Sequence, residues 1–145
     1  MYYGTILGRE GGVVDERVRG FLEKNHSAIM CTLKRDGTPH VARVGVGLVE
    51  GQLWSSGTDD RVRTGHLRRD PRATLAVMDD RNRQAWLGLE CEVDILDGPD
   101  RVDQNLALYR ALAGEPDDLQ EYRDAMVAEK RLIFQFNVKK AYGQY

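Results

Sequence analysis

Five arginines lie within the twelve residues from 61 to 72, with a single acidic residue, Asp70, among them. They are Arg61, Arg63, Arg68, Arg69 and Arg72. The chain as a whole carries a formal net charge of -2, so this positive charge is local and argues against a general nucleic-acid binder. Guanidinium groups hold phosphates and carboxylates by paired, charge-assisted hydrogen bonds. The stretch is therefore the first candidate for an anion-binding element.

The arginines need an element that positions them, and the spacing predicts a short helix over residues 61–70. A strand over 52–56 and a polar loop precede it, and the helix must end before Pro71 because the residue preceding a proline is biased away from helical dihedrals. A helix N-terminus presents unpaired N–H groups and the positive end of the helix dipole. Arg61 and Arg63 in that first turn predict a seat for a phosphate. A solvated arginine-rich helix without a ligand is the alternative that composition leaves open.

No self-contained catalytic constellation is visible. The histidines, His26, His40 and His66, have no metal-ligand spacing with one another or with Cys31 and Cys91, so no metal site is predicted. The two cysteines lie in apolar, strand-like runs and favour reduced thiols over a disulfide framework. No Gly-x-Ser-x-Gly elbow, Walker loop or dinucleotide-binding glycine pattern is present. An enzyme that takes its chemistry from a redox cofactor needs none of these, because the protein then supplies binding and orientation.

Length and composition indicate one globular domain. The 145 residues are 41% hydrophobic and 30% charged, which is typical of a soluble chain with a real core. Residues 1–13 contain four glycines and no clear periodicity, so they predict a mobile N-terminal arm or lid, followed by a single domain over 14–145. No apolar stretch reaches the length of a membrane span, and no basic segment followed by an apolar core opens the chain, so the predicted location is the cytoplasm.

The periodicity of the apolar residues predicts a mainly β (α+β) fold. Six strands are predicted, over 27–33, 39–49, 52–56, 73–78, 84–96 and 132–138. The first three strands are expected to form an antiparallel meander, with a bend or a close approach of a ligand at Gly45 and Gly47. Helical spacing predicts a helix that Asp15 caps and that runs to Lys24, and a helical hairpin broken at residues 114–117. Six strands with few helices are typical of a small antiparallel barrel.

Several segments resemble one protein superfamily in their order and spacing. Residues 64–77, Thr-Gly-His-Leu-Arg-Arg-Asp-Pro-Arg-Ala-Thr-Leu-Ala-Val, resemble the phosphate-binding segment of the pyridoxamine 5'-phosphate oxidase-like, FMN-binding split β-barrel superfamily. The similarity is closest to the actinobacterial flavin/deazaflavin oxidoreductases (class B) that use coenzyme F420. Further matching segments are 36–39, 108–115, 121–127 and 141–143. The resemblance implies a six-stranded antiparallel split β-barrel with peripheral helices, and a homodimer with the cofactor ring in the cleft between the chains.

The resemblance also implies which residues hold the cofactor. They are His40, Val41, Arg43, Val44, Ser55, Ser56, Arg61, Arg63 and Thr64, of which His40, Val41 and Val44 line the ring. Arg63 falls on the family's phosphate-contacting lysine, Arg61 on the basic position before it, and Ser56 on a hydroxyl at the end of the third strand. An arginine in place of the lysine keeps the charge but changes a point donor into a bidentate fork. Arg43 stands where close relatives often have a smaller polar residue, and it could alter which cofactor fits.

F420 is the expected cofactor, and FMN is the alternative. FMN ends in one phosphate, whereas F420 continues through a phosphodiester and lactate to several glutamates, so its longer anionic tail favours a basic track. The arginines that could provide such a track are Arg61, Arg63, Arg68 and Arg69, although helical spacing puts only some of them on one side. True pyridoxamine phosphate oxidases carry an arginine and a histidine close together near the C-terminus. Only lysines follow Arg131 here, which argues against vitamin B6 oxidation.

The first functional hypothesis is an F420-dependent oxidoreductase that passes hydride to an unsaturated small molecule, such as an enone, a quinone or a tetrapyrrole. An FMN-dependent flavoprotein is the second hypothesis. The third is a non-catalytic protein that binds a cofactor, a haem or a tetrapyrrole without turnover. No catalytic residue is assigned, and Tyr109, Tyr142, His40 and solvent all stay open as the proton donor.

Overall fold

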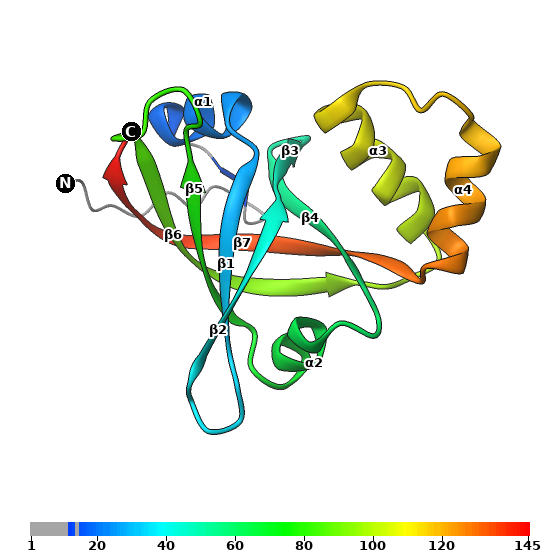
Figure 1. Cartoon of the computed structure of the whole chain (residues 1–145), viewed down its shortest axis with the longest axis horizontal. Coiled ribbons are helices and arrows are strands. Elements are labelled where there is room, and N and C mark those ends of the chain that lie inside the picture. Colours follow the sequence, from blue (N-terminus) through cyan, green and yellow to red (C-terminus); the bar gives the residue numbers. More distant parts are fainter. Residues whose placement is uncertain (1–11, 14) are drawn as a thin grey trace.

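The computed structural model describes residues 12, 13 and 15–145, and within them seven antiparallel strands form one curled sheet (Figure 1). The strands are β1 (Ser27–Leu33), β2 (Pro39–Gly45), β3 (Gly47–Val49), β4 (Gln52–Thr58), β5 (Arg72–Met78), β6 (Trp86–Leu96) and β7 (Arg131–Gln144). The helices are α1 (Glu16–Lys24), α2 (Val62–Arg69), α3 (Arg101–Ala113) and α4 (Leu119–Ala128). Helices α1 and α2 lie at opposite ends of the sheet, and α3 and α4 stand together to one side (Figure 1). The predicted mainly β fold is confirmed.

The two edges of the sheet are consecutive in the chain. The strand order is β2-β1-β5-β6-β7-β4-β3, so β2 lies at one edge and β3 at the other, although only Val46 separates them. The sheet must therefore curl until its edges meet. The Ser55 hydroxyl of β4 links them, because it donates a hydrogen bond of 2.7 Å to the carbonyl of Gly45 at the end of β2.

The single strand predicted over 39–49 is broken at Val46, and this break corrects the predicted count of six strands to seven. The N–H of Val46 donates to the carbonyl of His26 at 2.8 Å, and the carbonyl of Val46 accepts from the His26 ring at 3.1 Å. With both polar backbone groups turned to His26, Val46 takes no part in either ladder. The first three predicted strands therefore do not form one continuous meander, because β3 pairs with β4 at the edge far from β1. The predicted bend is confirmed.

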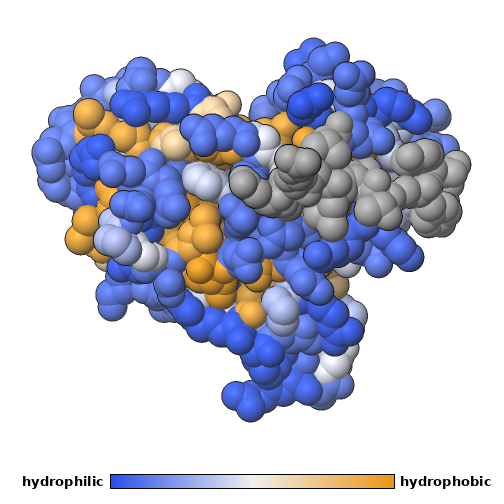
Figure 2. Space-filling model, turned by 180° about the vertical axis from the view of Figure 1, so that it is seen from behind, coloured by the Kyte–Doolittle hydropathy of each residue, from blue (hydrophilic) through white to orange (hydrophobic). Residues whose placement is uncertain are grey.

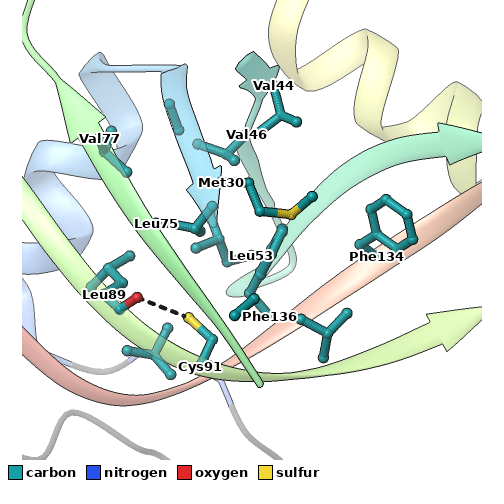
Figure 3. Close-up of a cluster of buried hydrophobic side chains, with 14 of the residues drawn as sticks. Met30, Val44, Val46, Leu53, Leu75, Val77, Leu89, Cys91, Phe134 and Phe136 are labelled. Carbon is teal, nitrogen blue, oxygen red and sulfur yellow. Dashed lines mark hydrogen bonds between the residues drawn. The ribbon is translucent and has the colours of Figure 1, made fainter. Parts of the chain in front are cut away.

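The hydrophobic core fills the inside of the curled sheet (Figure 3). Phe134 and Phe136 of β7, Leu53 of β4 and Met30 of β1 are among its largest fully buried side chains. Burying a side chain of this kind stabilises the folded state by about 1.5–3 kcal/mol relative to leaving it in water. The core therefore ties β7, β4 and β1 together, and these strands carry or flank most of the predicted site.

Strands β6 and β7 are the longest pair in the sheet. The buried side of β6 carries Leu87, Leu89, Cys91 and Val93, and its exposed side carries Glu90, Glu92 and Asp94, as the alternation predicts. Strand β7 runs on to Gln144, beyond its predicted end at residue 138, because it pairs with β6 along the whole length of that strand. A register shift between Glu90 and Cys91 lets the long pair bend.

The helices begin and end at the signals expected of them. The Asp15 carboxylate caps α1 by accepting hydrogen bonds from the N–H groups of Arg17 (3.0 Å) and Val18 (3.1 Å).

Helix α3 approaches β3 so closely that a Cβ on Gly47 would lie 2.8 Å from a methyl of Leu112. The close approach at this glycine is thus made by a helix of the same chain.

The predicted break in the helical hairpin is confirmed. Gly114 ends α3 with a φ of 80°, a backbone conformation that favours glycine. The Asp118 carboxylate then caps α4 by accepting from the N–H of Glu121 at 3.0 Å. Helix α4 contributes no fully buried side chain, so it is attached to the body of the protein mainly through α3.

Most of the predicted N-terminal arm, residues 1–11, lies outside the described part of the chain. Val13, at the end of that segment, is buried and donates its N–H to the carbonyl of Gly51 at 3.0 Å. Among the described residues, no helix combines the length and the apolar character that crossing a membrane requires.

Replacing His26 with alanine tests the link that closes the sheet. The substitution removes the ring donor of the Val46 carbonyl, and an unsatisfied buried acceptor costs about 1–3 kcal/mol. We expect the free energy of unfolding in urea to fall by that amount. Alanine at the exposed Gln84, in the β5–β6 turn, is the control and should change it by less than about 0.5 kcal/mol. Equal effects of the two substitutions would contradict the role of His26.

Candidate functional site

Three arginines converge where β4 passes into α2. Arg61 is the N-cap residue of α2, and Arg63 lies in its first turn. Arg131 joins them from the start of β7, because β4 and β7 pair with Thr58 opposite Arg131. We call Arg61, Arg63 and Arg131 the arginine seat. The positive end of the α2 dipole adds to their charge.

The arginine seat holds more positive charge than its own hydrogen bonds neutralise. The Nε atoms of Arg63 and Arg131 are both buried and have no hydrogen-bond partner among the described residues. Burial lowers the pKa of Arg63, and repulsion from Arg61 and Arg131 lowers it further. A buried donor left without an acceptor costs about 1–3 kcal/mol, so the seat is unfavourable as it stands. Arg61 is exposed, and Arg63 and Arg131 are partly exposed, so the outer nitrogens of these guanidinium groups could donate to an anion, and the donor set therefore fits a phosphate.

Two carboxylates stand beside the arginine seat. A hollow of about 340 Å³ is lined by Thr58, Asp60, Arg61, Glu129 and Arg131. The Asp60 carboxylate accepts a hydrogen bond of 2.6 Å from the Thr58 hydroxyl, which lowers the pKa of Asp60. Glu129 lies 2.9 Å from the Arg131 guanidinium. The lining of the hollow thus carries two arginines and two carboxylates, and the third positive charge of the arginine seat comes from Arg63.

The other two arginines of the predicted basic track have partners within the fold. The Arg68 guanidinium bridges Asp59 (3.1 Å) and Asp97 (3.2 Å). Arg69 donates to the backbone carbonyl of Leu33. The extended track expected along α2 is therefore reduced to the arginines of its first turn. The reason is geometric, because α2 turns its C-terminal arginines toward acidic loops and β1.

The hydroxyl groups predicted to hold the cofactor are all used as donors inside the protein. Ser55 donates to the carbonyl of Gly45, and Thr64 donates to the carbonyl of Thr58 at 2.7 Å. Ser55 and Thr64 are almost fully buried. A hydroxyl has one proton to donate, so these two groups support the β4–α2 backbone and offer an anion no free donor.

Ser56 is committed in the same way through Asn105, a buried residue of α3. The Asn105 amide nitrogen donates to the carbonyl of Arg101 at 2.8 Å, and this fixes which end of the amide faces Ser56. The amide oxygen then accepts the Ser56 hydroxyl proton at 2.5 Å. The backbone carbonyl of Asn105 also accepts from the Tyr122 hydroxyl at 2.9 Å, so α3 and α4 are both tied to β4. The assignment of Ser56 to the cofactor stays a prediction that this geometry does not favour.

Asn105 and Arg131 are functional candidates that sequence reasoning missed. Asn105 lies at helical spacing from Val102 and Tyr109, so a polar residue on a face predicted to be apolar was the available signal. No comparable signal marks Arg131. Its neighbourhood depends on the pairing of β4 with β7, which joins segments more than seventy residues apart.

The predicted β2 residues divide between the two faces of that strand. Val41 and Arg43 are exposed, whereas the Val44 side chain is buried in the core, so only its backbone could contact a ring. The His40 ring is half-buried and meets the buried His66 ring edge to face, with centroids 5.1 Å apart. Burial lowers the pKa of His66, and the nearby His40 lowers it further, so His66 is neutral at physiological pH.

Arg43 lies apart from the arginine seat. Its guanidinium donates to the Ser27 hydroxyl at 3.2 Å and lines an open groove of about 520 Å³ together with Lys24 and Val44. This groove shares no lining residue with the hollow at Arg61. A cofactor that used all the predicted residues would have to extend from one region to the other.

None of the side chains left open as proton donor lines the hollow beside the arginine seat. Tyr109 packs against Tyr122 with ring centroids 4.9 Å apart, and Tyr142 packs edge to face against Trp86 at 5.8 Å. In residues 12–13 and 15–145, no group of three or more His, Cys, Asp or Glu side chains could hold a metal ion. The described cationic side chains suit an anion, and redox chemistry at this place would have to come from a bound group.

The curled antiparallel sheet is consistent with a split barrel, and it carries a cationic turn between β4 and α2. A model of the family described as pyridoxamine 5'-phosphate oxidase matches residues 14–145. The chain belongs to this family.

Solved structures of three proteins illustrate how widely the fold is shared. A protein named F420 reductase is 21% identical, with a TM-score of 0.72 over 90% of this chain and 100% of its own. The conserved hypothetical protein Rv2991 from Mycobacterium tuberculosis is 19% identical, with a TM-score of 0.75 over 93% and 88% of the two chains. General Stress Protein 26 from Bacillus anthracis is 12% identical, with a TM-score of 0.64 over 88% and 90%. At these identities the likeness establishes the fold alone.

The roles of Ser56 and Arg63 can be separated by substitution. Ser56→Ala leaves the buried Asn105 oxygen without its donor, so we expect the free energy of unfolding to fall by about 1–3 kcal/mol. If F420 is the cofactor, as the resemblance implies, the same variant should bind it within about two-fold of the wild type, because the Ser56 hydroxyl of the wild type is not free to contact a phosphate. Urea denaturation and fluorescence titration measure the two quantities. A loss of F420 affinity as large as that of Arg63→Ala would identify Ser56 as a direct ligand.

Proposed function

We propose that the protein is an F420-dependent oxidoreductase that transfers hydride between the deazaflavin and an unsaturated small molecule. The observation that carries this proposal is the arginine seat, whose buried donors lack an acceptor, in a chain of the family described as pyridoxamine 5'-phosphate oxidase. The seat would hold the cofactor phosphate, with Arg63 in the position of the family's lysine. An enone, a quinone or a tetrapyrrole is the proposed class of substrate.

The chain's own residues would bind and orient the cofactor. Arg63 and Arg131 would each donate N–H groups to the phosphate oxygens, and Arg61, which is exposed, would contact the part of the tail that leaves the seat. Val41 and Arg43 on the outer face of β2 would meet the ring or its substituents. The bound deazaflavin supplies the hydride, since no described cluster of side chains provides redox chemistry.

FMN is the alternative cofactor, and a cofactor-binding protein without turnover is the alternative function. FMN also carries a phosphate that the arginine seat could hold. F420 is preferred because a protein named F420 reductase shares this fold and because a phosphodiester suits a seat with carboxylates beside it. Protein purified yellow, with oxidase activity, would favour FMN. Tight binding without acceptor-dependent reoxidation would favour the carrier.

A homodimer would place the cofactor between two chains. Val41 is 62% exposed, Met78 41% and Ile29 37%. Ile29 of β1 pairs with Arg43 of β2 in one ladder and with Ala76 of β5 in the other. The side chains of Ile29, Val41 and Met78 therefore share the outer face of β1, β2 and β5. Apolar side chains also surface on the face turned away from the viewer in Figure 1 (Figure 2). We propose that a second copy covers the face with Val41, which also carries the predicted ring contacts.

The proposed location is the cytoplasm. Cys31 and Cys91 are both free thiols, and thiols persist in a reducing compartment. Burial raises the pKa of Cys91, so that thiol is protonated and unreactive as well.

Arg63→Ala tests the assignment of the phosphate. Losing one charge-assisted contact costs about 1.5–3 kcal/mol, so we expect the dissociation constant for F420 to rise at least about ten-fold. Arg83→Ala in the exposed β5–β6 turn removes the same charge and should leave the constant unchanged. Fluorescence titrations with F420 and with FMN, at moderate and raised salt, measure both variants. Unchanged F420 affinity in Arg63→Ala would sink the assignment of Arg63, and preference for FMN would move the chain to the flavin alternative.

Val41→Glu tests the dimer. A carboxylate among the apolar side chains of the proposed interface loses its hydration, so we expect the variant to sediment as a monomer where the wild type sediments as a dimer. Folding should survive, because Val41 is exposed in the single chain. Val127→Glu, on α4 and 65% exposed, is the matched control and should stay dimeric. Dimers of Val41→Glu, or dissociation of Val127→Glu to the same degree, would contradict the proposed interface.

A further inference from the structure

Two carboxylates face any anion that enters the arginine seat. The hollow beside the seat is lined by Asp60 and Glu129 as well as by Arg61 and Arg131. Glu129 pairs with Arg131 at 2.9 Å, and Asp60 accepts the Thr58 hydroxyl proton at 2.6 Å. That hydrogen bond and the charge of Arg61 lower the pKa of Asp60, so its carboxylate is ionised at neutral pH. The bound anion would therefore feel two fixed negative charges besides the arginines.

Phosphate monoesters and phosphodiesters differ in the property that these carboxylates sense. A phosphate monoester carries a charge of about -1.5 to -2 at pH 7, whereas a phosphodiester has a single ionisable oxygen and carries about -1. Coulomb energy is proportional to the charge of the ligand. Each carboxylate therefore repels a dianion about twice as strongly as a monoanion at the same place, whatever the number of cations around it.

We propose that Glu129 and Asp60 are specificity-determining residues, which weaken the preference of the arginine seat for a doubly charged phosphate monoester and so improve the relative binding of a singly charged phosphodiester. The inference rests on the proposed function, in which the seat holds the phosphodiester of F420. Glu129 acts in a second way, because its ion pair with Arg131 must loosen when an anion takes that guanidinium. Removal of either carboxylate would therefore tighten the binding of every phosphate, and that of a doubly charged phosphate most.

The test compares two flavins that differ in one phosphate charge. FMN and its phosphate monomethyl ester carry the same ring, and flavin fluorescence gives the dissociation constant of each at a pH about two units above the second phosphate pKa of about 6. Because the repulsion energy scales with charge, we expect Glu129→Gln to bind FMN about ten-fold more tightly and the monomethyl ester about three-fold more tightly than the wild type does. Glu129→Gln should thus lower the ratio of the FMN dissociation constant to that of the monomethyl ester. Asp60→Asn, which keeps an acceptor for the Thr58 hydroxyl, should shift this ratio in the same direction.

Glu115→Gln is the matched control. Glu115 pairs with Arg110 at 2.8 Å, much as Glu129 pairs with Arg131, but it precedes α4 and Glu129 follows it. The 10 residues of α4 separate the two carboxylates by about 15 Å along the helix. The control removes the same charge far from the seat and should leave both dissociation constants unchanged.

The outcomes separate the inference from the proposed function on which it rests. An unchanged ratio in both Glu129→Gln and Asp60→Asn, or an equal shift in Glu115→Gln, would overturn the inference. F420 is titrated into the same proteins as a third probe. Binding of F420 with an unchanged ratio would overturn the charge selection alone, and a shifted ratio without F420 binding would support the selection and overturn F420 as the cofactor. Binding of none of the three probes would overturn both.

Discussion

The fold depends on one residue that belongs to neither strand beside it. Val46 hydrogen-bonds His26 through both its N–H and its carbonyl. Within this single residue the chain passes from β2, at one edge of the sheet, to β3, at the other. Buried backbone groups must be hydrogen-bonded, and His26 satisfies both groups of Val46. The curl that follows brings β2 against β4, where Ser55 closes the contact on Gly45. Every proposed cofactor contact, on β2 or after β4, takes its position from this closure.

In contrast to the satisfied backbone groups of Val46, the arginine seat lowers the stability of the fold. Buried guanidinium nitrogens without acceptors and mutually repelling cations are what a fold selected for stability alone would avoid. Sites that bind ligands often carry such unfavourable groups, which the ligand then satisfies. The surrounding structure can hold these arginines together because Arg131 is the first residue of the long β7 strand, and Arg63 lies on a helix held by the buried Thr64.

Support and recognition fall to different residue types in this site. Hydroxyl groups from β4 and α2 donate to backbone carbonyls or to Asn105, and they make the turn rigid. The helical hairpin contributes through Asn105, whose side-chain amide links Arg101 to Ser56 and whose backbone carbonyl accepts from the Tyr122 hydroxyl. In the proposed function, recognition is left to charge: the arginines would attract an anion, and Asp60 and Glu129 would limit how much negative charge is favoured. A rigid turn with a tuned charge is well suited to select among phosphates.

Local patterns in the sequence determined most elements of this protein, because each depends on neighbours within a few positions. The Asp15 cap, the end of α2 before Pro71, the break at Gly114 and the alternation of β6 all follow from such short-range chemistry. Tertiary structure alone decided that residues 39–49 form two strands at opposite edges, since His26 must reach Val46 for that break. It also decided the composition of the site. Sequence placed Arg61 and Arg63 together, but only the pairing of β4 with β7 brought Arg131 to them. Only the packing of α3 engaged the Ser56 hydroxyl in a hydrogen bond to Asn105. Contacts between distant segments are set by the packing of the whole sheet, which no local pattern encodes.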